Sequence, residues 1–139
     1  MCERGQQMKK ERKIEIPNPL PIDSDKQGYR ILAELVAQIT AEMEVILPEI
    51  KKINRYYIFS EEEGRRQNLG GACIQHGRGN AATYSIAICQ ISLASFPRAY
   101  QVLIHEFAHT RFMVHDDNFY ALVGKMYEIH YKSLIKLGI

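Results

Sequence analysis

The sequence predicts a compact α+β domain with an N-terminal helix, a small antiparallel sheet or hairpin, a further helix and a C-terminal helix. Apolar residues recur every three or four positions from Tyr29 to Leu47 and again from about Asp117 to Leu137. Between them, residues 83–92 alternate β-forming residues with small or polar ones. The 139 residues, 46% hydrophobic and 24% charged, suit one domain that buries its own core.

Residues 1–28 are predicted to be an extended leader, and residues 29–139 the folded domain. Alternating prolines disfavour a helix in the leader: Pro17, Pro19 and Pro21. Ser24 or Asp25 can cap the first helix, and Pro48 kinks or ends it.

The sheet is predicted from three short runs. Residues 56–59 are aromatic or β-branched and form one strand. The charged residues 61–66 are expected to form a solvated turn. Residues 71–75 and 83–92 are expected to pair as a hairpin, and Ser95 with Pro97 marks the start of the next helix.

That helix contains the motif His105-Glu106-Phe107-Ala108-His109, an H-E-x-x-H pattern. Residues four apart lie on one helical face, so the two imidazoles can converge on a single metal ion. Glu106 flanks that ion and can accept a proton from water bound to it. Two core histidines beside a solvated glutamate are the alternative, but burying such groups without a metal or partners is costly.

A catalytic zinc site needs a third protein ligand, and the candidates are His115, Glu128, His76 and His130. On a continuous helix His115 would lie about 9 Å beyond His109 along the axis and about 240° around it. The helix must therefore end between Thr110 and Val114 and turn back. No glycine is available for that turn, although Asp116 and Asp117 can cap a new helix.

Helical geometry ranks the other candidates lower. Glu128 falls about 180° from Phe119 in the apolar stripe of the last helix, on the solvated face. His130 lies inside that stripe and is expected to be a core histidine or one that supports a ligand. His76 lies in a glycine-rich turn and is expected to be exposed. The predicted ligands are His105, His109 and His115.

Charge and cysteine content bear on the partners of the protein and on its cellular compartment. Residues 1–13 carry a net charge of +3, expected to form a solvated tail, with a weak phosphate-binding arm as the alternative. The other residues hold 13 basic and 14 acidic groups, which does not favour a nucleic-acid partner. Neither a membrane span nor a secretory signal is recognisable. Three cysteines without a Cys-x-x-Cys pair favour an intracellular, reducing compartment.

The motif, the five-residue gap, His115-Asp116 and the following Phe119-Tyr120 resemble the SprT-like and WLM-type zinc metallopeptidases and the related YgjP-like proteins. The resemblance covers residues 69 to 127 and includes Leu69-Gly70 and Ile91-Ser92-Leu93 upstream. It implies a minigluzincin-like, zincin-like fold, with zinc on the three histidines and Glu106 as general base. It also implies a protein or peptide substrate, in some members a protein attached to DNA.

The expected activity is therefore zinc-dependent peptide hydrolysis. Tyr84, Arg111 and His130 are candidate donors to the oxyanion of the tetrahedral intermediate. A peptide is expected to pair with the open edge of the hairpin. One alternative is a metal-stabilised binding or regulatory module with little turnover. Another is a latent peptidase whose leader covers the cleft.

Overall fold

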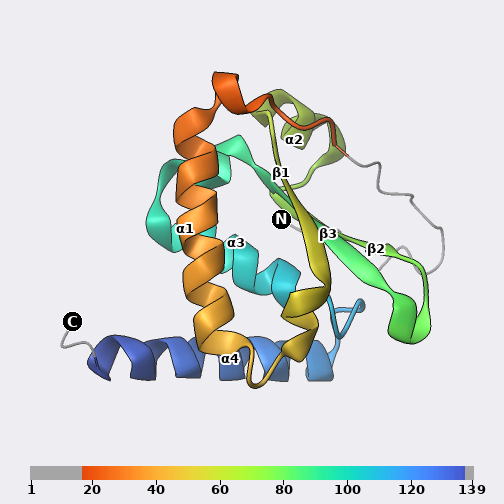
Figure 1. Ribbon diagram of the computed structural model, residues 1–139, viewed down its shortest axis with the longest axis vertical. Helices are drawn as coiled ribbons and strands as arrows, with labels where there is room; N and C mark the ends of the chain where they lie inside the picture. Colours follow the sequence, from red (N-terminus) through yellow and green to blue (C-terminus); the bar gives the residue numbers. More distant parts are fainter. Residues whose placement is uncertain (1–16, 137–139) are drawn as a thin grey trace.

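The computed structural model describes residues 17–136 as one layer of helices on a three-stranded sheet, with a short helix on the other face (Figure 1). The basic head at residues 1–13 and most of the predicted leader lie outside the described residues. The main elements are α1 (Lys26–Met43), β1 (Ile53–Phe59), α2 (Glu61–Gln67), β2 (Gly71–His76), β3 (Thr83–Cys89), α3 (Phe96–Ala108) and α4 (Asp117–Lys136). Short 3-10 helices connect them: η2 (Ile22–Ser24), η3 (Pro48–Lys52), η4 (Gly79–Ala81) and η5 (Gln90–Ala94).

The α+β class is confirmed, but the sheet is mixed rather than antiparallel. The strand order is β1-β3-β2. The hairpin of β2 and β3 is antiparallel as predicted, whereas β1 pairs parallel to β3, with Tyr56 opposite Ile86. The reason is connectivity: the chain leaves β1 through α2, adds β2 at the far edge and returns along β3 in the original direction.

The predicted turn at residues 61–66 is also wrong, because these residues form α2. Ser60 caps the helix by accepting a hydrogen bond from the backbone N–H of Glu63 at 3.1 Å. Asn68 ends it in the left-handed conformation with φ 57°. The helix packs on the sheet through Gly64, where an added Cβ would lie 2.8 Å from the sulfur of Cys89.

The helix boundaries otherwise differ little from the predicted ones. The first helix begins at Lys26, inside the predicted leader, and ends at Met43, before Pro48. Strand β3 stops at Cys89, and residues 90–94 form η5 instead of continuing the strand. Within the described part of the chain, no helix is long and apolar enough to cross a membrane.

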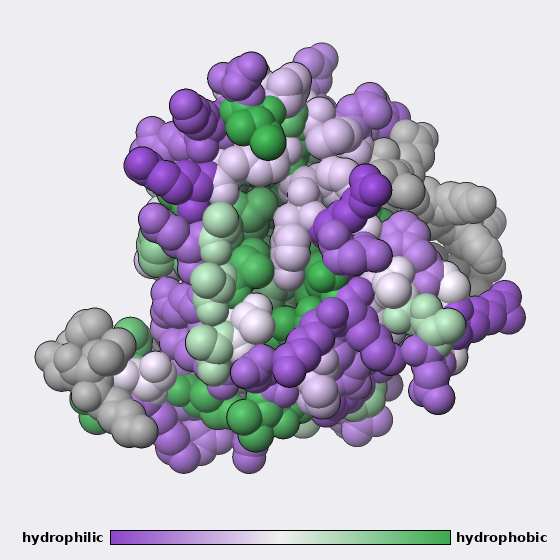
Figure 2. Space-filling view, viewed as in Figure 1, coloured by the Kyte–Doolittle hydropathy of each residue, from purple (hydrophilic) through white to green (hydrophobic). Residues whose placement is uncertain are grey.

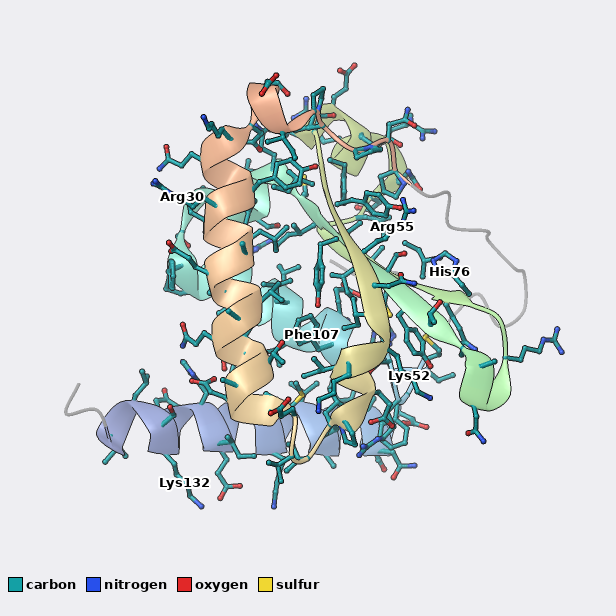
Figure 3. The ribbon with its side chains drawn as sticks, viewed as in Figure 1. Arg30, Lys52, Arg55, His76, Phe107 and Lys132 are labelled. Carbon is teal, nitrogen blue, oxygen red and sulfur yellow. The ribbon has the colours of Figure 1, made fainter. Side chains whose placement is uncertain are left out.

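The main core lies between the inner face of the sheet and helices α1, α3 and α4. Phe107 is at its centre, where its ring meets Tyr56 edge-on with centroids 6.4 Å apart (Figure 3). Other side chains with no exposed surface in this core include Leu35, Ile39, Met43, Ile58, Ile88, Leu103, Ile104, Phe119 and Met126. Hydrophobic residues also reach the surface between α1 and β1 and along α4 (Figure 2). This core fixes α3 against the sheet, and α3 carries the paired histidines.

The described end of the leader runs beside the outer edge of β1. The backbone N–H of Leu20 donates to the carbonyl of Ile58 at 2.8 Å. The Tyr29 hydroxyl donates to the carbonyl of Leu20 at 2.8 Å. The chain around Leu20 therefore lies at the sheet edge opposite β2.

Candidate metal centre

Helix α3 presents the two motif histidines from one face, as its sequence predicts. Ser95 caps the helix by accepting a hydrogen bond from the backbone N–H of Arg98 at 3.3 Å, and Pro97 stands in the first turn. The apolar stripe of the helix is buried against the sheet and α1. The rings of His105 and His109 lie 4.9 Å apart, on the side of α3 that faces the start of α4.

The chain reverses direction immediately after α3, which ends at Ala108. The carbonyl of Ala108 accepts hydrogen bonds from the backbone N–H groups of Arg111 and Phe112, both at 3.1 Å. The Thr110 hydroxyl donates to the Phe107 carbonyl at 2.7 Å. Among residues 17–136 positive φ values occur at Asn68, Gly77 and Gly79, so the reversal uses ordinary conformations and requires no glycine.

The reversal brings His115 back to the two motif histidines. The Nε2 atoms of His105 and His115 are 3.1 Å apart. One ligand nitrogen from each of the three histidines lies within 4.8 Å of the others. Tetrahedral ligands at 2.0–2.1 Å from one zinc ion are separated by about 3.3 Å, so the donor set and its spacing suit such an ion.

His109 is held in the orientation that a metal ligand needs. Its Nδ1 lies 2.9 Å from the carbonyl oxygen of Phe112, to which a protonated Nδ1 donates. This bond leaves Nε2 with its lone pair for a metal. Burial lowers the pKa of His109 to about 4, so the ring is neutral near pH 7.

Phe119 packs against all three imidazoles from the first turn of α4. Its ring stacks on His109 with centroids 4.5 Å apart and meets His105 and His115 edge-on at 4.9 and 5.0 Å. The phenylalanine has no exposed surface. Asp116 fixes this turn, because its carboxylate accepts a hydrogen bond from the backbone N–H of Phe119 at 3.1 Å. The sequence placed Phe119 in the apolar stripe of the last helix but gave no sign of its contact with the histidines.

Glu106 lies in a buried position between α3 and β2. Its side chain is on the same helix as the two histidines, and the residue is 1% exposed. Its Oε2 would be 3.2 Å from a Cβ at Gly71, which places the carboxylate directly against the edge strand. Burial, and then the charge of Glu106, raises the pKa of the nearby Cys73 thiol. Glu106 is thus a buried carboxylate on the helix that carries two of the three imidazoles, which makes it the candidate general base.

The other ligand candidates lie away from the cluster. Glu128 is exposed on α4 and pairs with Lys132 at 3.6 Å, as its helical angle predicts. His130 lies 3.2 Å from both carboxylate oxygens of Glu42 and stacks on Tyr100 with centroids 4.0 Å apart. His76 is at the exposed end of β2, with its Nε2 2.8 Å from the Ser85 hydroxyl (Figure 3).

Two of the three candidate oxyanion donors have other partners. Arg111 donates to the Glu49 carboxylate through Nε at 2.9 Å and Nη2 at 2.8 Å. His130 is turned toward Glu42. Tyr84 lies on the inner face of β3 and is 8% exposed.

Comparisons of the chain with protein-family models, curated proteins and solved structures found no match. The functional argument therefore rests on the residues of this chain and their arrangement.

Proposed function

We propose that this chain is a zinc-dependent metallopeptidase with His105, His109 and His115 as metal ligands and Glu106 as the general base. The observation that carries the proposal is the convergence of three imidazole nitrogens within 4.8 Å, together with the buried carboxylate of Glu106 on the helix that presents two of them. Three imidazoles suit several divalent metals, among which availability and tetrahedral geometry favour zinc, and three protein ligands leave a coordination position open, as in catalytic sites.

The chemistry divides between the metal and Glu106. A zinc ion at this site supplies a Lewis acid that acidifies water and polarises a carbonyl group. Glu106 takes a proton from the attacking water and delivers it to the leaving amine. The neutral state of His109, favoured by burial, keeps its Nε2 available as a ligand near pH 7.

The open edge of β2 supports a peptide substrate. The Gly70 carbonyl accepts a hydrogen bond from the Cys89 N–H at 2.9 Å, so residues 70 and 89 form a hydrogen-bonded antiparallel pair. By alternation, the main-chain groups of residues 71, 73 and 75 point away from β3. Within the described chain, only β3 pairs with β2. An extended peptide added at this edge would run beside Glu106 and be held by backbone hydrogen bonds.

The decisive experiment compares the parent protein with Glu106→Gln. Both should bind about one zinc per chain, whereas only the parent should cleave an unfolded, fluorescently labelled protein, with a loss of at least about 100-fold in the variant. Glu128→Gln is the matched control, because that glutamate is exposed on α4 and away from the histidines.

Each other outcome has a definite meaning. Equal cleavage by parent and Glu106→Gln would remove Glu106 from the mechanism. Stoichiometric zinc with no cleavage by either protein would instead support a metal-stabilised binding or regulatory module. Repeating the assay with added DNA tests the DNA-associated activity that the SprT-like resemblance implies, and cell fractionation tests an intracellular location.

A further inference from the structure

Strand β2 crosses α3 at Gly71 with no room for a side chain. A Cβ at this position would lie 2.7 Å from Val102 Cγ1, 3.2 Å from the carbonyl oxygen of Ala87 and 3.2 Å from Glu106 Oε2. The first distance is shorter than real Cβ contacts, and the other two are tighter than about nine in ten of them. Gly71 is buried and has no positive φ, so close approach, not backbone conformation, is what favours glycine here.

The close approach at Gly71 joins two parts of the proposed site, the Glu106 carboxylate and the substrate-binding edge of β2. Gly71 is the β2 residue whose missing side chain faces Glu106, and its main-chain groups point to the open edge. Next along the same face is Cys73, whose thiol pKa is raised chiefly by burial and then by the Glu106 charge. The carboxylate is therefore confined between α3 and the strand along which a substrate would lie.

We propose that Gly71 is a positioning residue that sets the separation between the edge strand and the Glu106 carboxylate. This inference rests on the proposed function. The bare backbone at residue 71 lets Glu106 reach the water and the scissile bond of a peptide paired with β2. A methyl group there would push the carboxylate away by a few tenths of an ångström, because the Ala87 carbonyl blocks movement of the strand toward β3.

A packing role is the competing explanation, because the shortest contact is with Val102. The variant Val102→Ala removes the atom at 2.7 Å and leaves the contacts to Ala87 and Glu106 unchanged. Comparing Gly71→Ala/Val102→Ala with Val102→Ala therefore isolates the effect on Glu106. Gly124→Ala is the control for adding a methyl group, because nothing lies within 4 Å of a Cβ at Gly124.

The experiment measures zinc affinity by chelator competition, kcat and KM on a labelled peptide, and crystal structures of both Val102→Ala proteins. We expect the double variant to match Val102→Ala within about twofold in zinc affinity and KM but to lose about tenfold in kcat, as a small displacement of a reacting group predicts. Its crystal structure should show the Glu106 carboxylate moved away from strand β2.

Equal kcat in the two proteins would overturn the proposal, and so would an unmoved carboxylate. If the parent protein cleaves nothing, the proposed function fails, but the crystal comparison still decides whether Gly71 places Glu106. If single Gly71→Ala does not fold while the double variant does, the contact with Val102 accounts for the folding defect and the kcat comparison remains decisive.

Discussion

The Glu49–Arg111 ion pair ties the chain reversal to η3, and its loss should weaken zinc binding. Arg111 lies in the reversal between the second and third histidines and donates two hydrogen bonds to the Glu49 carboxylate, at 2.8 and 2.9 Å. A further bond joins its Nη2 to the Ile46 carbonyl at 3.1 Å. These contacts hold the segment that carries His115 against the residues that follow α1.

The variant Glu49→Gln removes the charge and keeps the shape. The side chains of Arg111 and Glu49 are 33% and 26% exposed, so the pair is only partly buried. Its contribution to stability should lie between that of a hydrogen bond to a charged group, about 1.5–3 kcal/mol, and that of an exposed ion pair, below about 1 kcal/mol. We therefore expect the free energy of unfolding to fall by about 1 kcal/mol, which lowers Tm by about 4 °C. If all of this energy orders the reversal, zinc affinity falls by at most about fivefold.

The pH dependence has a definite sign. The hydrogen bond from Arg111 lowers the pKa of Glu49 below its ordinary value of 4.5. The stabilisation is therefore fully present above pH 4.5 and is lost as pH falls through the lower folded-state pKa. The difference in stability between the metal-free parent and Glu49→Gln should accordingly shrink in acid.

The assay combines thermal unfolding of the metal-free proteins with zinc affinity from chelator competition. Glu61→Gln is the control, since the ion pair of Glu61 with Arg65 lies at the surface, where these side chains are 51% and 70% exposed. Unchanged zinc affinity in a Glu49→Gln protein that has lost stability would refute the reasoning. The reversal would then be held by its own backbone bonds and by Phe119.

Two further predictions concern the histidines. Phe119→Ala should lower the free energy of unfolding by about 3–5 kcal/mol and weaken zinc binding, because the ring is fully buried. Tyr120→Ala is the control: this residue is 57% exposed, so its free energy of unfolding should change by less than about 0.5 kcal/mol. Urea denaturation of both variants measures the two free energies. Because burial lowers the pKa of His109 from 6.5 to about 4, the metal-free protein should lose stability as pH falls from 6.5 towards 4, and His109→Gln should flatten that part of the stability profile.

The long helices were predictable because their information is local. Apolar residues at helical spacing fix the buried faces of α1, α3 and α4, and the same spacing aligns His105 with His109. The angle of Glu128 on its helix also predicted correctly that it would be exposed. Helix α2 was missed because its seven residues carry no apolar period, and it is held by the Ser60 cap and by packing through Gly64.

The sequence by itself determined the helical faces, the motif and the requirement for a chain reversal if His115 is to join it. Tertiary structure decided that the reversal forms without glycine, that β1 runs parallel to β3, and that Phe119 and Gly71 border the site. The physical reason is the range of the interactions. Spacing along a helix follows from dihedral angles within a few residues, whereas contacts such as Glu49 with Arg111 join residues 62 positions apart and exist only once the core has formed.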